Sequence, residues 1–312
     1  MPSLTRRDFV ITCAALASGP TGQAAATELR FPKAPRDRLA VASYPFRALM
    51  DRTGHPGLKL TEFAAMVADK FGIRNIEPLS SHFPSTEPAY LDELRSAVER
   101  AHSHIVNIPA GVGASLYDPD SARRDAAVAG GKKWVDVAAA VGSPSIRVHI
   151  QGARGVAPDM GRTSESLKQV ADYGAAKKIM VTLENDDLVT EDAFFLTKVI
   201  DTVNSPWLRA LPDFGNSMLK GDEAFNYKAV EAMFHRAYNI SHVKDSEVEG
   251  GKVFRVDMAK TFGIAKAAGY HGYFSMEWEG QGGPYEGTQK LVDARNPVPT
   301  LVGHAVRNPN SS

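Results

Sequence analysis

The stretch Val181-Thr182-Leu183-Glu184-Asn185-Asp186-Asp187 decides the fold class of this chain. Its apolar run follows a basic helix end at Lys177 and Lys178 and stops at the carboxylate of Glu184. Three later segments repeat this design, each a short strand-like run with a metal-competent side chain at or near its C-terminal end: 208–213, 240–242 and 273–277. Such runs are typical of buried strands in a parallel sheet.

The four strand-end side chains are Glu184, Asp213, His242 and Glu277. They follow one another at intervals of about 30 residues, which is the length of one βα unit. If successive units close into a barrel, the C-terminal ends of their strands meet at one mouth. The spacing therefore predicts that these four side chains converge.

The rest of the chain supplies further strand-like runs, which alternate with segments of helical period. The expected strands are 39–44, 73–77, 104–108 and 145–150, and the expected helices are 60–71, 90–102, 121–141, 164–178, 191–203, 227–237 and 257–268. This alternation predicts a (β/α)8 TIM barrel. A doubly wound open sheet is the alternative, but no Gly-rich phosphate loop opens any of the helices. Pro297 and Pro299 interrupt the last helical segment (285–306), which we expect to be short or irregular.

The N-terminus has the features of an export signal. The segment Thr5-Arg6-Arg7-Asp8-Phe9-Val10 resembles a twin-arginine signature, an apolar run (9–17) follows it, and Ala24-Ala25-Ala26 offers a small-residue cleavage site. An amphipathic N-terminal helix is the alternative. We expect residues 1–26 to be a twin-arginine signal peptide, 27–38 an entry linker and 39–312 the barrel.

Composition and charge restrict the partners of this chain. Hydrophobic residues make up 43% and charged residues 23%, and Lys+Arg and Asp+Glu balance at 36 each. This neutrality argues against a nucleic-acid binder. The single cysteine, Cys13, lies in the predicted signal, and Thr12 before it argues against a lipoprotein anchor. We therefore expect a periplasmic protein that uses the twin-arginine export machinery, has no membrane anchor after processing and contains no disulfides. A homo-oligomer is compatible with the sequence.

Three carboxylates and one imidazole suit a divalent cation such as Mn²⁺, Mg²⁺, Co²⁺ or Zn²⁺. No thiolate is among the candidates, which favours the harder ions, with Mn²⁺ first. A single Glu, Asp or His at a strand end is more commonly a helix cap or a core residue. Four such residues at the same position of successive βα units are much harder to explain as helix caps or core residues.

Four short motifs carry a resemblance to a known family: Leu183-Glu184-Asn185, Asp213-Phe214-Gly215-Asn216, His242-Val243-Lys244-Asp245 and Ser275-Met276-Glu277. They resemble the metal motifs of the xylose-isomerase-like TIM-barrel superfamily, which holds sugar isomerases, epimerases and inosose dehydratases. The resemblance implies that Glu184, Asp213, His242 and Glu277 bind one divalent metal ion. It also implies that Glu184 and Glu277 are the acid/base pair, acting on an enediolate.

The chain departs from the sugar 3-epimerases of that superfamily at two places. They usually have a His where this chain has Asn216, and an Arg shortly after the residue that matches His242. This chain instead has Lys244, which lies on the same side of the strand as His242. Lys244 is therefore a candidate catalytic residue that contacts a substrate oxygen or a leaving group. The alternative is an ion pair with Asp245 or Asp213.

Weaker candidates for substrate binding lie at other strand ends. Glu77 and His149 end the second and fourth strands, and either could instead be a core or cap residue. Tyr44 and Phe46 follow the first strand, where an aromatic ring could stack on a sugar. Asn216, the last residue of the Asp213-Phe214-Gly215-Asn216 motif, completes the substrate-binding candidates.

Three functions remain open. The first is a metal-dependent isomerase or epimerase of an unphosphorylated sugar or keto-sugar, since phosphosugars are cytoplasmic. The second is a metal-dependent lyase or dehydratase that acts on a 3-keto-glycoside or an inosose-like substrate. The third is a non-catalytic sugar-binding barrel, which the four filled metal positions disfavour.

Overall fold

The computed structural model describes residues 29–51, 55–220 and 222–295. The predicted signal peptide (1–26), Cys13 and the cleavage site therefore lie outside the described residues. The barrel strands are β1 (Leu39–Ala42), β2 (Asn75–Glu77), β3 (His104–Ile105), β4 (Pro109–Gly111), β5 (Ser145–His149), β6 (Met180–Glu184), β7 (Leu208–Leu211), β8 (Ile240–Val243) and β11 (Tyr273–Met276). The helices are α1 (Leu60–Phe71), α2 (Pro88–Arg100), α3 (Ser121–Val141), α4 (Met160–Lys177), α5 (Ala193–Val203), α6 (Glu223–Phe234), α7 (Met258–Ala267) and α8 (Pro284–Arg295).

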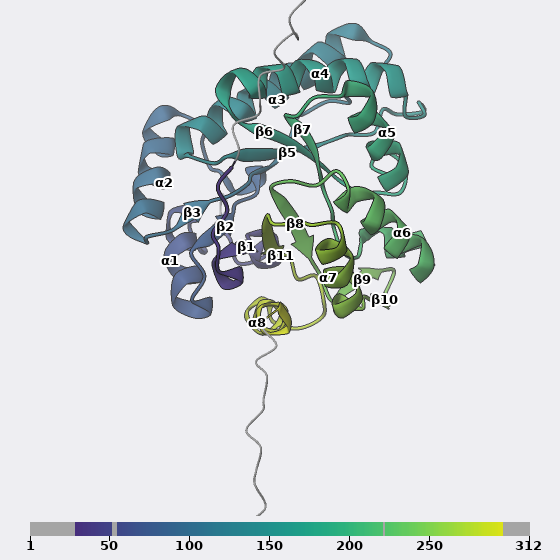
Figure 1. The fold of residues 1–312 in the computed structure, drawn as a ribbon. Helices are drawn as coiled ribbons and strands as arrows, with labels where there is room; N and C mark the ends of the chain where they lie inside the picture. The colour runs from purple at the N-terminus through teal and green to yellow at the C-terminus, as the bar shows by residue number, and fades with distance from the viewer. Residues whose placement is uncertain (1–28, 52–54, 221, 296–312) are drawn as a thin grey trace, which may run out of the picture.

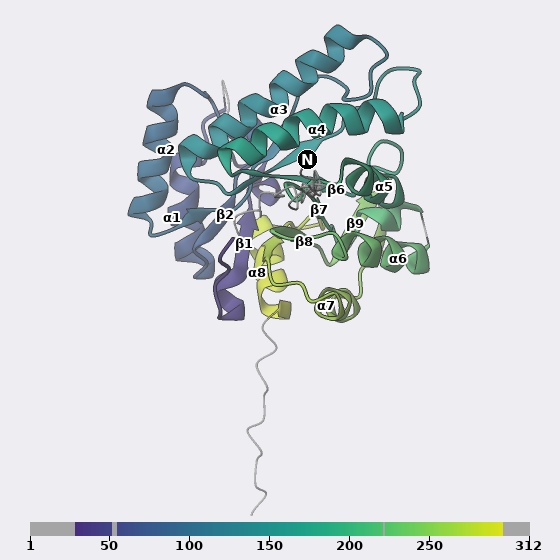
Figure 2. The ribbon, with the colours of Figure 1, turned by 45° about the horizontal axis from the view of Figure 1, so that its top comes forward.

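The strands form a closed ring surrounded by the helices (Figure 1, Figure 2). One sheet has the order β3-β2-β1-β11-β8 and the other β4-β5-β6-β7, and all of their pairs are parallel. Bridges Ala210–Ala237 and Asp213–His242 join β7 to β8. On the other side, β3 pairs with β2 and β4 pairs with β5, so these two short strands share the third position of the ring. The predicted (β/α)8 barrel is confirmed.

Aspartates define the starts of most of the helices. The side chain of the N-cap residue accepts a backbone N–H in α3, α4, α5, α6 and α7, where the caps are Asp120, Asp159, Asp192, Asp222 and Asp257. These bonds satisfy amide groups that have no partner within the helix. The helices are therefore set in place just after the loops that form the mouth of the barrel.

The structure adds a feature that was not predicted from the sequence. A hairpin of β9 (Ser246–Glu249) and β10 (Lys252–Arg255) follows β8, with Gly250 and Gly251 at positive φ in its turn. The described part of the last helical segment is helix α8, which ends at Arg295, and Pro297 and Pro299 lie outside the described residues. In the predicted linker, Phe31 packs edge-on against Tyr238 and Tyr273, so the segment that was expected to be an entry linker lies against the barrel.

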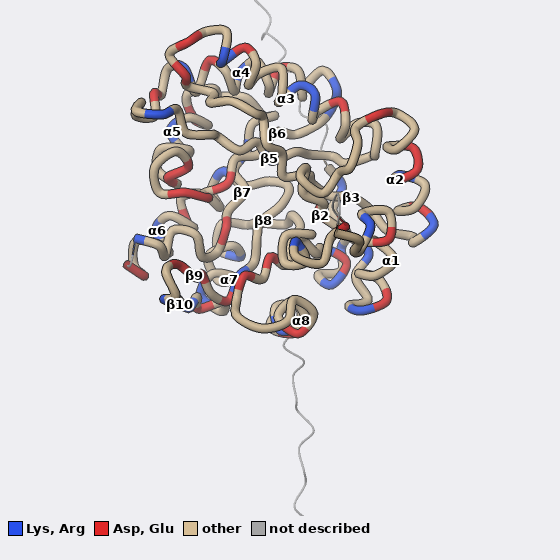
Figure 3. Tube along the Cα trace, turned by 180° about the vertical axis from the view of Figure 1, so that it is seen from behind, with Lys and Arg blue, Asp and Glu red and all other residues tan. Residues whose placement is uncertain are grey.

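The outer surface carries both signs of charge. Lys and Arg positions alternate with Asp and Glu positions over the helices and loops in Figure 3, in keeping with the formal net charge of +0. None of the helices among the described residues has the length and apolar character that crossing a membrane requires.

Two glycines inside helices predict opposite effects on stability. A Cβ at Gly130 in α3 would lie 2.4 Å from the carbonyl oxygen of Val112, whereas a Cβ at Gly263 in α7 would have nothing within 4 Å. Gly130→Ala should destabilise the fold by about 1–3 kcal/mol through overpacking. Gly263→Ala, the matched control, should stabilise it by about 0.5–1 kcal/mol, because alanine is the better helix former. Urea unfolding measures both, and destabilisation of equal size would contradict the packing argument.

Candidate metal centre

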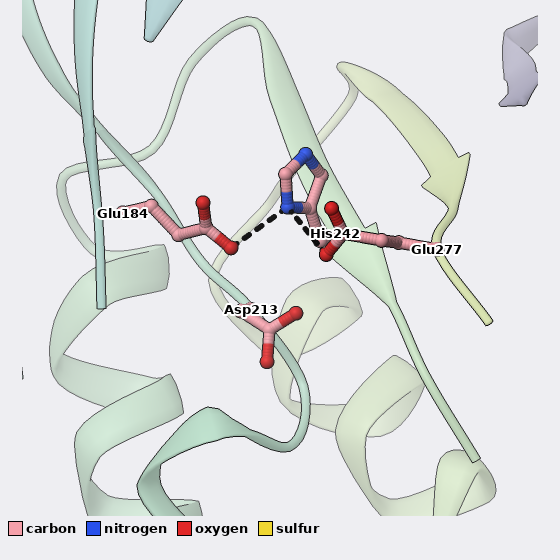
Figure 4. Close-up of side chains that lie close together, drawn as sticks. All are labelled: Glu184, Asp213, His242 and Glu277. Carbon is pink, nitrogen blue, oxygen red and sulfur yellow. Dashed lines mark hydrogen bonds and ion pairs between the residues drawn. The ribbon is translucent and has the colours of Figure 1, made fainter. Parts of the chain in front are cut away.

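Four side chains from consecutive strand ends meet inside the mouth of the barrel (Figure 4). Glu184 is the last residue of β6, Asp213 lies two residues beyond β7, His242 lies in β8 and Glu277 follows β11. One ligand atom from each lies within 4.8 Å of the others, and all four side chains are buried. The predicted convergence is present in the structure.

His242 is held between carboxylates on both sides of its ring. Nδ1 lies 2.8 Å from Glu184 Oε1 and 3.0 Å from Glu277 Oε2, and Nε2 lies 3.0 Å from both oxygens of Glu77. If Nε2 carries the proton and donates it to Glu77, the lone pair of Nδ1 faces Glu184 and Glu277. A carboxylate behind a histidine in this way is the usual arrangement for a metal-bound imidazole.

Asp213 supplies the clearest test of whether a cation fits. Its Oδ1 accepts the backbone N–H groups of Gly215 and Asn216 at 2.8 and 2.7 Å. Its Oδ2 is buried and has no hydrogen-bond partner. A buried polar atom without a partner is costly, and a divalent ion next to Oδ2 would remove that cost. Together with Glu184, Glu277 and the Nδ1 lone pair, it gives a donor set suited to a hard divalent cation.

The electrostatics of the centre also favour binding of a cation. Burial, together with the neighbouring Glu184 and Glu277, raises the pKa of Asp213 well above its ordinary value. Burial likewise raises the pKa of Glu277. On Glu184 burial acts in the same direction, but His242 and Arg147 outweigh it and lower its pKa. A bound divalent cation would favour the ionised form of all three carboxylates.

Lys244 lies beside the centre and is completely enclosed by polar groups. Nζ donates to Asn216 Oδ1 at 2.7 Å and lies 3.2 Å from Glu247 Oε2 and Glu279 Oε2. It also lies 3.6 Å from Asp213 Oδ2 and from Glu277 Oε2. Burial alone would lower its pKa, but the carboxylates raise it well above the ordinary value, which favours the ammonium form. Of the two ion pairs considered from the sequence, the structure forms the one with Asp213.

A sequence profile of the xylose isomerase-like TIM barrel family matches residues 65–296, which is well over half of the chain. The chain belongs to this family. No match was found among curated proteins.

Solved structures with a similar barrel include sugar epimerases. The D-allulose 3-epimerase of Methylomonas sp. has a TM-score of 0.65 at 16% identity, covering 85% of this chain and 98% of that chain. The 3-keto-D-glucoside 4-epimerase YcjR of E. coli has a TM-score of 0.63 at 14% identity, covering 83% and 98%. A xylose isomerase-like TIM barrel protein of Mycobacterium smegmatis, solved in complex with magnesium, has a TM-score of 0.64 at 16% identity, covering 83% and 96%. At these identities the similarity concerns the fold.

In this xylose isomerase-like barrel, two predicted substrate residues are fully buried. Glu77 is fully buried behind His242 and accepts a hydrogen bond from Asn107 Nδ2 at 2.7 Å. It therefore reaches the centre only through the imidazole. Phe46 is fully buried in the core, where its ring packs against Phe63 and Tyr285 at 5.7 and 5.2 Å between centroids. The prediction of substrate stacking on Phe46 is wrong for that reason.

The other predicted substrate residues lie at the mouth. Asn216 places Nδ2 3.4 Å from Glu184 Oε1. Tyr44 is partly buried, and burial, followed by the charge of Glu279, raises its pKa to about 12. One face of its ring is covered by the Arg47 guanidinium, whose Cζ lies 4.1 Å from the ring centroid.

His149 belongs to a second group with Asp186 and Glu191, whose ligand atoms also lie within 4.8 Å of one another. His149 Nδ1 lies 2.9 Å from Glu191 Oε2 and 3.4 Å from Asp186 Oδ2. The Arg147 guanidinium contacts both carboxylates of this group, and so already neutralises part of its charge. The group is therefore an ion-pair network beside the centre.

Three residues at the site were not predicted from the sequence: Arg147, Glu247 and Glu279. Arg147 lies in the buried strand β5, and an arginine is rarely buried without a carboxylate partner, which was the available signal. Glu247 lies in the unpredicted hairpin, for which Gly250-Gly251 between two strand-like runs was the available signal. Glu279 follows Glu277 at a spacing of two, which places both on one side of the chain.

Glu77→Gln tests whether Glu77 supports metal binding through the imidazole of His242. A glutamine keeps the volume but no longer accepts the Nε2 proton in the same way, so we expect metal affinity to fall about 10–100-fold. Calorimetric titration of metal-free protein with Mn²⁺ measures this. Glu99→Gln, an exposed position on α2, is the control. Unchanged affinity in Glu77→Gln would show that Glu77 does not support a metal-binding imidazole.

Proposed function

We propose that this family member is a divalent-metal-dependent isomerase or epimerase that acts through an enediolate on an unphosphorylated sugar or keto-sugar. The observation that carries the proposal is the convergence of Glu184, Asp213, His242 and Glu277, with Asp213 Oδ2 buried and without a hydrogen-bond partner. Glu184, Asp213 and Glu277 would hold the ion by carboxylate oxygens, and His242 by Nδ1. Mn²⁺ is the proposed ion, with Mg²⁺, Co²⁺ and Zn²⁺ as alternatives.

Two carboxylates at the centre account for the proton transfer. When bound, a divalent ion polarises the substrate carbonyl and stabilises the enediolate. Glu277 or Glu184 removes the α-proton. Return of a proton by the other carboxylate on the opposite face inverts the carbon, and transfer on the same face to the neighbouring carbon gives isomerisation. Lys244, a buried ammonium ion beside Glu277, donates a hydrogen bond to a substrate oxygen.

Lys244 also favours a second candidate, a lyase or dehydratase acting on a 3-keto-glycoside or an inosose-like substrate. The ammonium group lies 3.6 Å from Glu277 Oε2, so a proton donor and a carboxylate base lie side by side. After α-proton removal by Glu277, Lys244 could give a proton to the oxygen of a departing β-substituent. The electron pair of the broken C–H bond then forms the new double bond.

The charges of the centre support an unphosphorylated substrate. Arg147 and Lys244 are the lysine and arginine side chains that contact the centre in the described part of the chain. Each of them already contacts at least three carboxylates, so the protein itself balances both positive charges and leaves no excess to balance a phosphate dianion. The twin-arginine-like segment at residues 5–10 supports a periplasmic location and transport by the export machinery. A periplasmic location fits an unphosphorylated substrate, because phosphosugars are cytoplasmic.

A panel of free sugars, keto-sugars and 3-keto-glycosides, incubated in D₂O with Mn²⁺, tests the proposal. Deuterium at the α-carbon of recovered or isomerised sugar is the expected result. Release of an aglycone or of water would instead favour the lyase or dehydratase. Sugar binding without exchange or turnover across the panel would indicate a non-catalytic binding barrel and overturn the proposal.

A further inference from the structure

The Arg147 guanidinium lies beside one of the two glutamates of the centre. Arg147 is in β5, and β5 pairs with β6, in the register Arg147–Thr182. Its side chain reaches past this pair to the end of β6, where Nη2 lies 3.0 Å from Glu184 Oε2. Only 7% of Arg147 is exposed, so this contact is screened little by solvent.

The two oxygens of Glu184 therefore have different partners. Oε2 faces Arg147, whereas Oε1 lies 2.8 Å from His242 Nδ1 and 3.4 Å from Asn216 Nδ2. The carboxylate is held from both sides, with Oε1 towards the centre. Among the described residues no arginine pairs with Glu277, whose Oε2 lies 3.0 Å from His242 Nδ1 and 3.6 Å from Lys244 Nζ.

Arg147 is itself fixed by residues that follow β6. Nη2 lies 2.6 Å from Asp186 Oδ2 and 3.5 Å from Glu191 Oε2. Glu191 is fixed in turn, because its Oε1 accepts the backbone N–H of Ile150 at 2.6 Å. The guanidinium thus has a set position relative to the strand that carries Glu184.

We propose that Arg147 is a positioning residue: it holds Glu184 by Oε2, so that Glu184 offers a single oxygen, Oε1, to the metal. This rests on the proposed function of the centre. The positive charge of Arg147 also makes the electrostatic potential at the metal position less negative. Removing the Arg147 guanidinium should allow both oxygens of Glu184 to turn to the metal. The protein should then bind the metal more tightly, but Glu184 should lose the orientation that proton transfer needs.

Removal of Arg147 should therefore raise metal affinity and lower turnover. In Arg147→Met, the dissociation constant for Mn²⁺ should fall about tenfold or more, because a neighbouring positive charge is lost. The kcat for the sugar identified from the panel should fall about 10–100-fold, with KM changed much less. A residue that only stabilised the fold would lower metal affinity, turnover and the unfolding temperature together.

Mn²⁺ binding followed by the electron paramagnetic resonance of free Mn²⁺, with kcat, KM and thermal unfolding on the same samples, tests this. Arg236→Met, which removes a partly exposed guanidinium that pairs with Asp201, is the control and should match wild type in binding and turnover. Arg147→Lys keeps the charge but shortens the reach. It should therefore bind Mn²⁺ like wild type and turn over about tenfold more slowly or worse.

Weaker Mn²⁺ binding in Arg147→Met, or wild-type kcat in either Arg147 variant, would overturn the positioning role and leave the proposed function standing. If Arg147→Met does not fold, the kcat of Arg147→Lys decides: a value about tenfold lower or less supports the positioning role, and a wild-type value overturns it. Wild-type protein that binds no Mn²⁺ would overturn the proposed function and, with it, this role of Arg147.

Discussion

Glu277→Gln is expected to lower kcat by about 10²–10⁴-fold while the barrel stays folded, because glutamine fills the same volume but cannot accept a carbon-bound proton. Glu184→Gln should have an effect of the same order, since the proposed mechanism uses both carboxylates. The measurement is kcat on the sugar found by the panel, at saturating Mn²⁺, with circular dichroism as the check on folding. Glu99→Gln, exposed on α2, should behave like wild type.

Both glutamates are also proposed ligands, so loss of metal must be separated from loss of the base. Mn²⁺ binding measured on each variant makes that separation, because a variant that still binds Mn²⁺ and does not turn over has lost proton transfer itself. Full activity in both variants would show that neither carboxylate is the acid or the base.

The second large effect is a rise in stability on adding metal. An ion that binds only the folded chain at about 100 times its dissociation constant adds about 2.7 kcal/mol to the free energy of unfolding. For a domain of this size that corresponds to an increase of roughly 5–10 °C in Tm. Differential scanning calorimetry of EDTA-treated protein, with and without Mn²⁺, measures the change.

Asp213→Asn is the control for the predicted rise in Tm on adding Mn²⁺. The pKa of Asp213 is raised by burial and by the nearby carboxylates, so its ionised form costs free energy in the metal-free fold. The asparagine variant should therefore unfold at the same temperature as metal-free wild type or higher, and Mn²⁺ should no longer raise its Tm. An equal increase in both proteins would place the stabilising ion elsewhere.

The barrel and the four converging residues could be predicted because they follow from local patterns. Short apolar runs at a regular interval specify parallel strands, and parallel strands in a ring bring their C-terminal ends to one mouth. To predict the four converging side chains, it was enough to know which position of each βα unit lies at or near the end of the strand. That position holds Glu184, Asp213, His242 and Glu277. Their contacts then depend on the fold class rather than on details of packing.

Phe46 and Glu77 could not be placed in this way. Residues Tyr44–Phe46 form a turn of 3-10 helix, which breaks the alternation of the preceding strand and turns Phe46 into the core. Glu77 ends β2, and it contacts His242 of β8 across the barrel, between strands that do not pair with each other. Contacts of that kind depend on the radius of the ring and on side-chain lengths, which strand patterns do not contain.

The most direct test of the account is where a divalent ion binds in a crystal of the protein soaked with Mn²⁺. An anomalous difference map should show a peak about 2.0–2.6 Å from one donor atom of each of Glu184, Asp213, His242 and Glu277. No peak at that position, or a peak only at the His149, Asp186 and Glu191 group, would contradict it.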